Sequence, residues 1–72
     1  MTEKKNEQIE RAFTYHAPKP DQIPRYQYIR DTGKELATYI DSNCPNSREK
    51  SLALTKLEET VMWANASIAR NE

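Results

Sequence analysis

Apolar side chains recur at alternating steps of three and four residues through the C-terminal third of the sequence, at Leu54, Leu57, Val61, Ala64 and Ile68. This spacing lays side chains along one seam of an α-helix. Residues 61–66 are apolar on more than one face, and such a helix must bury itself against more than one neighbour. The pattern therefore predicts a helix over about 46–71 that packs against several surfaces.

A second seam with the same spacing precedes it, formed by Tyr26, Ile29, Gly33, Leu36 and Ile40. It predicts a helix over about 21–41. The connection to the C-terminal helix is short enough to make the two helices antiparallel neighbours. Gly33 costs such a helix about 1 kcal/mol relative to Ala. We therefore expect a close approach at Gly33, either of the other helix or of a ligand.

Residues near the ends of these two helices indicate where each begins. Asp21 is the expected N-cap of the first, and Pro24 is tolerated in its first turn because that N–H has no helical partner. The turn-forming run 41–45 ends this helix. Asn46 is the expected N-cap of the second helix, with Glu49 three places on completing a capping box.

The N-terminal part of the chain predicts a short helix followed by a stiff loop. Residues 2–12 are mostly polar helix formers with one narrow apolar stripe, so the helix is marginal unless it docks. Two prolines at alternate positions follow, and they fix φ and extend the residues before them. Residues 13–20 should therefore form an ordered elbow that presents Tyr15 and His16.

A single core of 72 residues is usually marginal without disulfides, metal or oligomerisation. Cys44 is the only cysteine and His16 the only histidine, so neither a disulfide within the chain nor a four-ligand zinc site can supplement it. Self-association through the apolar C-terminal helix is the remaining supplement. We predict an all-α fold, with residues 1–72 forming one helical hairpin domain assembled as a homo-oligomer.

Charge and hydropathy narrow the choice of partners. Eleven Lys and Arg balance eleven Asp and Glu, so no overall field attracts DNA or RNA. No apolar run approaches the roughly 20 residues of a membrane span, and the first residues lack the apolar stretch of a secretory signal. We expect a soluble intracellular protein that binds neither nucleic acids nor membranes. A small anion held by local cations remains compatible with this balance.

No catalytic arrangement emerges from the sequence. It has no serine with a plausible base and acid, no glycine-rich phosphate loop and no His–acid pair for metal-assisted hydrolysis. We therefore expect no enzymatic activity, cofactor or metal. We interpret His16 as an elbow residue that donates to a backbone carbonyl, in preference to a general base. Cys44 is expected to be a half-buried side chain at the hairpin tip.

Two cations and two small residues share a stripe of the first long helix: Arg30, Gly33, Lys34 and Ala37. One explanation is a solvated charged face in which acids such as Asp31 or Glu35 pair with the cations. The other is a phosphate site, since small neighbours let an anion approach closely. Tyr15 on the elbow favours the second explanation, because an aromatic face beside phosphate-binding cations suits a nucleotide.

The C-terminal helix carries a second set of polar candidates. Arg48 lies at its start, where the helix dipole favours an anion, although capping with an exposed arginine is the commoner explanation. Asn65 in the apolar segment needs a hydrogen-bond partner, either across a subunit interface or on a ligand. Arg70 lies beside this segment. We interpret Trp63 as a packing anchor between chains.

Four motifs taken together resemble those of a known family: YHxP at 15–18, RYxxIRxxGKEL at 25–36, CPxSRExS at 44–51 and MWANAxIARN at 62–71. They are similar to small phage proteins that inhibit CBASS defence by sequestering its cyclic-nucleotide messenger. The helical hairpin also resembles that of phage sponges that inhibit Thoeris defence. The resemblance covers the chain from about residue 13 to its end.

The resemblance implies a non-enzymatic sponge in the cytoplasm of the infected bacterial host. It implies a homo-oligomer, hexameric in the family, that binds cyclic dinucleotides such as 3′,3′-cGAMP between protomers, and in some members cyclic trinucleotides at separate sites. Tyr15 would stack on a base. Arg30 would face the phosphates, where some relatives have lysine. Lys34 would be a secondary cation, with His16 and Gly33 as neighbouring ligand contacts.

For a second ligand pocket, the resemblance indicates Arg48, Asn65 and Arg70 as candidate contacts. A different class of protein also fits the residues: a small helical adaptor or antitoxin-like module that uses the apolar helix to mask a partner protein. Such a module would be a monomer or dimer with an exposed apolar face. Nucleic-acid binding is a third hypothesis, and it predicts a steep salt dependence that the balanced charge argues against.

Overall fold

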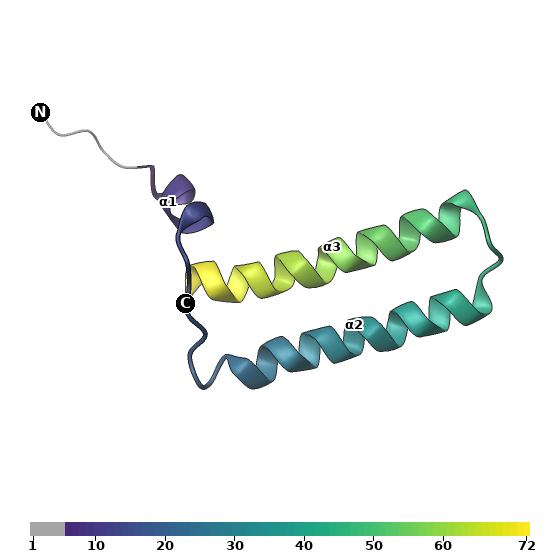
Figure 1. The fold of residues 1–72 in the computed structure, drawn as a ribbon, viewed down its shortest axis with the longest axis horizontal. Helices are drawn as coiled ribbons and strands as arrows, with labels where there is room; N and C mark the ends of the chain where they lie inside the picture. Colours follow the sequence, from purple (N-terminus) through teal and green to yellow (C-terminus); the bar gives the residue numbers. More distant parts are fainter. Residues whose placement is uncertain (1–5) are drawn as a thin grey trace, which may run out of the picture.

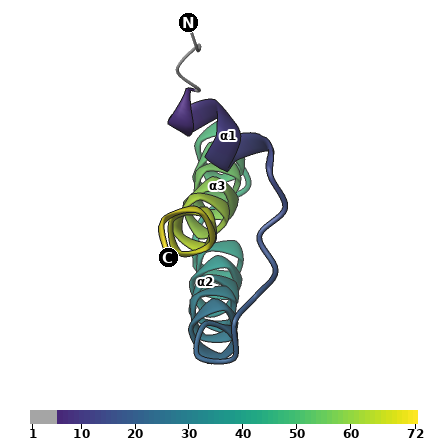
Figure 2. The ribbon, with the colours of Figure 1, turned by 90° about the vertical axis from the view of Figure 1, so that its left-hand side faces the viewer.

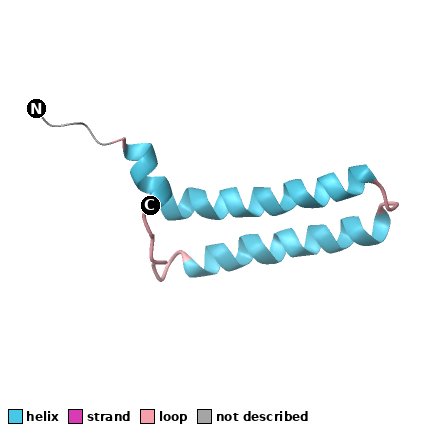
Figure 3. Ribbon diagram, turned by 45° about the horizontal axis from the view of Figure 1, so that its top comes forward, coloured by secondary structure: helices cyan, strands magenta, loops and turns pink. Residues whose placement is uncertain are grey.

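The protein is a helical hairpin preceded by one short helix, in the part of the chain that the computed structural model describes, residues 6–72. Helix α1 spans Glu7–Phe13, α2 spans Ile23–Asn43 and α3 spans Arg48–Asn71. Helices α2 and α3 lie side by side and antiparallel, and α1 lies near the C-terminal end of α3 (Figures 1 and 2). No strand occurs within residues 6–72 (Figure 3). The predicted all-α hairpin is confirmed.

Helix α1 occupies the second half of the expected helix over about 2–12, of which residues 2–5 lie outside the described residues. Asn6 is its N-cap, and the Oδ1 atom accepts from the backbone N–H groups of the second and third helical residues at 3.0 and 3.2 Å. The side chains of Ile9 and Phe13 remain 55% and 87% exposed. Helix α1 therefore contacts α3 without burying its own apolar stripe.

The N-cap of α2 is Gln22, one residue after the expected Asp21. Gln22 has helical backbone angles and makes no side-chain capping bond, because its side chain is turned toward the elbow. The carboxylate of Asp21 lies 3.7 Å from the guanidinium of Arg25 instead. Pro24 lies in the first turn of the helix, as predicted.

The N-cap of α3 is Ser47, where the sequence favoured Asn46. Ser47 is extended, and its Oγ accepts from the backbone N–H of Lys50 at 3.1 Å. Because Lys50 occupies the third helical position, the expected capping box with Glu49 does not form. The Nζ of Lys50 also donates to Asn46 Oδ1 at 2.9 Å. The expected half-burial of Cys44 is wrong, since it is exposed, at the C-cap of α2 where the connection to α3 begins.

The seam between α2 and α3 follows the predicted spacing closely. The partly buried residues include Tyr26, Ile29, Gly33, Ala37 and Ile40 on α2, and Leu54, Leu57, Val61, Ala64 and Ile68 on α3. Leu36 departs from the prediction because it is 50% exposed, and Ala37 takes its place in the seam. A small side chain suits a position between closely packed helices.

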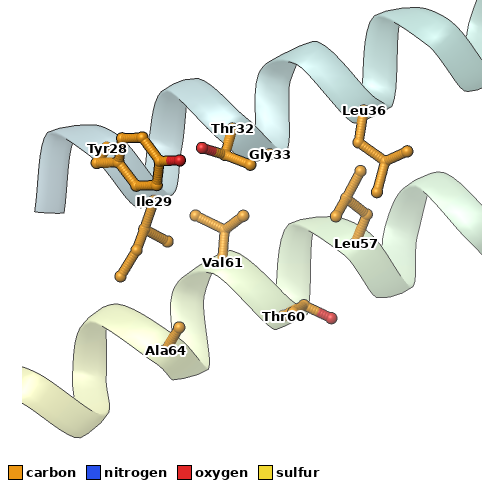
Figure 4. A pocket seen from close by; sticks show the side chains of 9 residues that line it. All are labelled: Tyr28, Ile29, Thr32, Gly33, Leu36, Leu57, Thr60, Val61 and Ala64. Carbon is orange, nitrogen blue, oxygen red and sulfur yellow. The ribbon is translucent and has the colours of Figure 1, made fainter. Parts of the chain in front are cut away.

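Gly33 marks a close approach of the two helices. A Cβ atom added there would lie 2.5 Å from the Cγ2 atom of Val61, which leaves no room for any other side chain. Figure 4 shows Val61 pointing from α3 toward Gly33 on α2. The approach predicted at Gly33 is therefore confirmed, and its partner is the other helix.

The hairpin is long and thin. Helix α3, with 24 residues, is roughly 36 Å long. The radius of gyration of the chain, 16.5 Å, exceeds the roughly 11 Å expected of a compact domain of 72 residues. Within residues 6–72 no hydrophobic side chain is buried, and the only buried residue is Gln22, which is 2% exposed. One chain thus forms a seam without a closed core.

Candidate functional site

The elbow runs along one side of the hairpin, from α1 to the start of α2 (Figure 2). His16 attaches it to α1, because its Nε2 donates to the carbonyl oxygen of Arg11 at 2.8 Å. This bond confirms the structural role predicted for His16, and it places a proton on Nε2, since a carbonyl can only accept. His16 is partly buried, whereas the neighbouring Tyr15 is 83% exposed.

The second attachment of the elbow is a hydrogen-bond network of Lys19, Gln22, Arg25 and Glu72, which we call the Glu72 network. Arg25 donates to the two carboxylate oxygens of Glu72 at 2.9 and 2.6 Å, and Gln22 Nε2 donates to the same carboxylate at 3.2 Å. Lys19 Nζ donates to the backbone carbonyl oxygen of Glu72 at 2.9 Å. Hydrogen bonds from Arg25 and Gln22 lower the pKa of Glu72 from 4.5 to about 2. The network ties the end of α3 to the start of α2.

A groove of about 370 Å³ opens beside the elbow, and we call it the Arg30 groove. It is lined by His16, Pro18, Tyr26, Arg30, Asn65, Ala66 and Ala69. The elbow, α2 and α3 all contribute side chains to it. The structure thus brings His16 and Arg30, predicted ligand contacts, to one surface with Asn65, which the resemblance had assigned to a second pocket.

The guanidinium of Arg30 is exposed and available to a ligand. Within residues 6–72, neither Arg30 nor Lys34 forms an ion pair, so the acids on their own helix do not neutralise them. Asp31 instead accepts a hydrogen bond from Gln27 at 2.9 Å. A free guanidinium offers a planar fork of N–H donors that matches the oxygens of a phosphate.

Asn65 contributes an acceptor that has no partner among residues 6–72. Its Oδ1 is shielded from solvent and accepts no hydrogen bond from the described part of the chain. A buried acceptor left unpaired costs about 1–3 kcal/mol. Ala66 and Ala69 lie beside it on the groove and are small enough to leave room for an incoming group. A donor brought by a ligand or by a second copy of the chain would satisfy this atom.

Lys34 and Gly33 lie on a neighbouring groove, which is lined by Gly33, Lys34, Ala37, Leu54, Leu57, Glu58 and Val61. Lys34 is one turn beyond Arg30, or roughly 6 Å along the helix axis. The predicted stripe of cations and small residues therefore divides between two grooves. A ligand bound at Arg30 reaches Lys34 only if it extends along α2.

The residues assigned to a second pocket do not come together within one chain. Arg48 begins α3 and Asn65 lies 17 residues later, roughly 26 Å along the helix. Arg70 lies near the C-terminal end of α3, and its guanidinium is over the ring of Trp63, 5.7 Å from the centroid. A pocket that uses both Arg48 and Arg70 therefore requires more than one chain. The ring of Trp63 is 56% exposed.

An apolar groove of about 240 Å³ lies between α2 and α3 (Figure 4). Its lining is Tyr28, Ile29, Thr32, Gly33, Leu36, Leu57, Thr60, Val61 and Ala64. No charged side chain lines it, so it suits another apolar surface better than a nucleotide. Among residues 6–72, no group of three His, Cys, Asp or Glu side chains could hold a metal ion. Neither long helix in this range has the apolar stretch that a membrane-spanning helix requires.

The fold and the Arg30 groove define a small helical-hairpin module with grooves on its surface. A family model described as the Acb2/Tad1 hairpin domain matches residues 5–69. The chain belongs to this family, the sponges that counteract CBASS and Thoeris defence. No curated protein and no solved structure matches the chain. The resemblance seen in the four motifs is thereby confirmed.

Sequence reasoning missed the Glu72 network. Gln22 and Glu72 are 50 residues apart, and neither belongs to an apolar seam or to a stripe of one helix. The predicted hairpin could nevertheless have indicated it. Lys19, Gln22 and Arg25 lie at or near the start of the first long helix, and an antiparallel hairpin brings the end of the second helix, followed by Glu72, to the same place. Opposite charges at the same end of a hairpin favour a contact.

Proposed function

We propose that the protein binds cyclic oligonucleotide second messengers and sequesters them without cleaving them, so that CBASS effectors are not activated. Its ligands are 3′,3′-cGAMP and related cyclic dinucleotides, with cyclic trinucleotides as a second class. The observation that carries this proposal is the Arg30 groove, where an unpaired guanidinium lies on one surface with the unpaired acceptor of Asn65. Membership in the sponge family supports the same function.

Each part of a cyclic dinucleotide has a counterpart among these residues. The guanidinium of Arg30 donates to the phosphodiester oxygens. The exposed ring of Tyr15 on the elbow stacks on a base, and stacking of this kind is worth about 1–3 kcal/mol per base. Asn65 Oδ1 accepts from an N–H group that enters the groove. Lys34 adds a second cation for the part of the ligand that extends along α2.

The proposed mechanism is mass action, without turnover. A protein that binds the messenger tightly lowers its free concentration below the level that the effector needs. The number of sites and their affinity then determine protection, and no catalytic group is required. The protein would act in the cytoplasm of the infected bacterial host, where the messenger is made.

We infer that the working form is a homo-oligomer, a hexamer by analogy with the family. The Arg30 groove is open, so one hairpin covers only part of a ligand, whereas a second copy could enclose the rest. The apolar groove and the exposed side chains of Phe13, Met62 and Trp63 provide surface for that association. Tyr15 is not among the residues that line the Arg30 groove of its own chain, and in such an assembly it can lie near the Arg30 groove of another chain.

A second candidate function is favoured by the apolar groove alone. An adaptor or antitoxin-like module would place that groove against a partner protein, and it would leave cells bound to that partner as a monomer or dimer. The two functions differ in what the purified protein does with a nucleotide. Only the sponge gains thermal stability from 3′,3′-cGAMP, since a ligand that binds the folded state raises the melting temperature.

Titration calorimetry with 3′,3′-cGAMP tests the proposal directly. We expect tight binding by the wild-type protein and a loss of about 5- to 150-fold in affinity for both Tyr15→Ala and Arg30→Ala, because each removes an interaction worth about 1–3 kcal/mol. Lys56→Ala is the control, since it removes an exposed cation whose only ion pair among residues 6–72 is with Glu59. Unchanged affinity in both test variants would exclude this site.

A further inference from the structure

Gln22 stands apart from every other described residue because it is polar and buried. It is 2% exposed, while the hydrophobic residues of the same range are all at least partly exposed. Burying an amide costs free energy unless its donors and acceptors are paired. The Oε1 of Gln22 accepts from the backbone N–H of Lys19 at 2.9 Å and from the hydroxyl of Tyr26 at 3.4 Å, and its Nε2 donates to Glu72 at 3.2 Å.

The three partners of Gln22 belong to three different segments. Lys19 lies in the elbow, Tyr26 belongs to α2 and lines the Arg30 groove, and Glu72 follows α3. One amide therefore joins the three segments that surround the groove.

The elbow is held at Lys19 from both sides. Its N–H donates to the side chain of Gln22, and its carbonyl accepts from the backbone N–H groups of Gln22 and Ile23 at 2.9 and 3.3 Å. The residues on either side of Lys19 are prolines, whose φ angles are fixed. Fixing Lys19 therefore also fixes Pro18, which lines the Arg30 groove one residue away.

Glu72 determines which way the amide of Gln22 is turned. A carboxylate can only accept, so the nitrogen of the amide must face Glu72 and the oxygen must face the N–H of Lys19. With the amide reversed, two donors would meet at Lys19. Arg25 holds the carboxylate at 2.9 and 2.6 Å, so its position does not depend on Gln22 alone.

We propose that Gln22 is a positioning residue for the Arg30 groove, and that Glu72 acts through it: together they hold the elbow where its side chains face Arg30. The residue need not touch the ligand. Its effect is preorganisation, since a groove wall that is already ordered loses less entropy when a ligand binds. The effect on affinity rests on the proposed function, whereas the effect on the elbow does not.

Order in the elbow can be measured without any ligand, from the ¹⁵N order parameter of the Lys19 amide. We expect a value near 0.85 in the wild-type protein and below about 0.6 in Gln22→Ala, the ranges typical of rigid and flexible backbone. Gln27→Ala is the matched control, because Gln27 is an exposed glutamine of the same helix whose side chain, within the described part of the chain, is hydrogen-bonded only to Asp31. An unchanged order parameter in Gln22→Ala would overturn the proposal.

Exchanging the side chains of Gln22 and Glu72 distinguishes a loss of elbow positioning from a general loss of protein stability. Gln22→Glu keeps the acceptor for Lys19 but places a second carboxylate against Glu72, so the Lys19 amide should become mobile. In the double variant Gln22→Glu with Glu72→Gln, the donor and acceptor change places, and order should return. The role assigned to Glu72 would be contradicted if the Lys19 amide stayed mobile in the double variant while circular dichroism showed that the helices were still formed.

The same variants titrated with 3′,3′-cGAMP test the consequence for binding. We expect affinity to fall about tenfold in Gln22→Ala and Gln22→Glu, to recover in the double variant and to stay unchanged in Gln27→Ala. A mobile elbow with undiminished affinity would overturn the positioning role and leave the proposed function intact. If the wild-type protein bound no nucleotide, the proposed function would fail, and the order parameters would still decide whether Gln22 holds the elbow.

Discussion

Glu72 couples the stability of the protein to pH. Its carboxylate accepts hydrogen bonds from Arg25 and Gln22 and lies near Lys19, and its pKa falls from 4.5 to about 2. The carboxylate of Asp21 lies 3.7 Å from the same Nη2 atom of Arg25 that contacts Glu72. Because the folded pKa lies below the unfolded one, its contribution to stability is complete above pH 4.5 and is lost as the pH falls from there to about 2. We expect Glu72→Gln to flatten the pH dependence of the melting temperature in that interval.

Thermal melts at several pH values between about 2 and 6 measure this effect. Glu58→Gln is a suitable control, since Glu58 is an exposed acid of α3 that takes part in no ion pair among residues 6–72. Curves that run parallel for Glu72→Gln and the wild-type protein over the acidic interval would show that the carboxylate does not stabilise the fold.

Individual residues differ in how far the sequence could place them. The bond from His16 to a backbone carbonyl was predicted, because a histidine before a proline-rich loop has few other partners nearby. Asn65 was correctly singled out as an amide in need of a partner. The role of Gln22 was not predicted because its partner Glu72 lies 50 residues away in the sequence. Patterns within one helix do not indicate contacts between residues so far apart.

Packing between α2 and α3 depends on the absence of a side chain at Gly33. Gly33→Ala gains about 1 kcal/mol of helix propensity but places a methyl group 2.5 Å from Val61 Cγ2. Overpacking of this kind costs about 1–3 kcal/mol, and a β-branched side chain in a helix has little freedom to move aside. We therefore expect Gly33→Ala to lower the free energy of unfolding.

In a variant with a shorter side chain at position 61, Gly33→Ala should raise the free energy of unfolding instead of lowering it. In a Val61→Ala background the space beside Gly33 is free, so Gly33→Ala should stabilise that variant by about 1 kcal/mol. Denaturant unfolding of the four proteins at one protein concentration gives the comparison. If Gly33→Ala changed the free energy of unfolding in the same direction in both backgrounds, the contact with Val61 would not be the reason that position 33 excludes a side chain.

The helices themselves were largely predictable. The three-and-four spacing placed the seams of both long helices, and only Leu36 gave way to Ala37, because the smaller side chain fits the seam. Each N-cap was displaced by one residue. Propensity does not choose between Asn46 and Ser47, since Asn and Ser are about equally favoured N-caps. It does favour Asp21 over Gln22, yet α2 has Gln22 as its N-cap, without a side-chain capping bond.

The proposed site depends on the association of several chains, because one hairpin covers only part of a ligand. Leu36 lies on the apolar groove and is 50% exposed, so a carboxylate there would leave the hairpin seam intact while opposing burial of the groove. We expect Leu36→Glu to lower the mass measured by light scattering while retaining helicity. Thr38→Glu adds the same charge two residues away, outside the apolar groove, and should leave the mass unchanged. A wild-type monomer would contradict the proposed assembly.

The site was harder to predict than the fold. The sequence placed Arg30 and Lys34 on one stripe, yet the packing of α3 assigns them to different grooves. It also left Asn65 and Arg30 in separate pockets, since only the antiparallel pairing of α2 with α3 brings them together. Which side chains share a groove depends on how two helices are rotated against each other, and spacing along one helix does not contain that information.

Sequestration requires that the protein bind a cyclic dinucleotide and release it chemically unchanged. The most direct measurement is to incubate the purified protein with 3′,3′-cGAMP, remove unbound nucleotide, denature the complex by heat and analyse what is released by mass spectrometry. We expect intact 3′,3′-cGAMP, recovered in proportion to the protein and strongly reduced in Arg30→Ala. Recovery of a linear or cleaved product would make the protein an enzyme, and no recovered nucleotide at all would leave it without the proposed ligand.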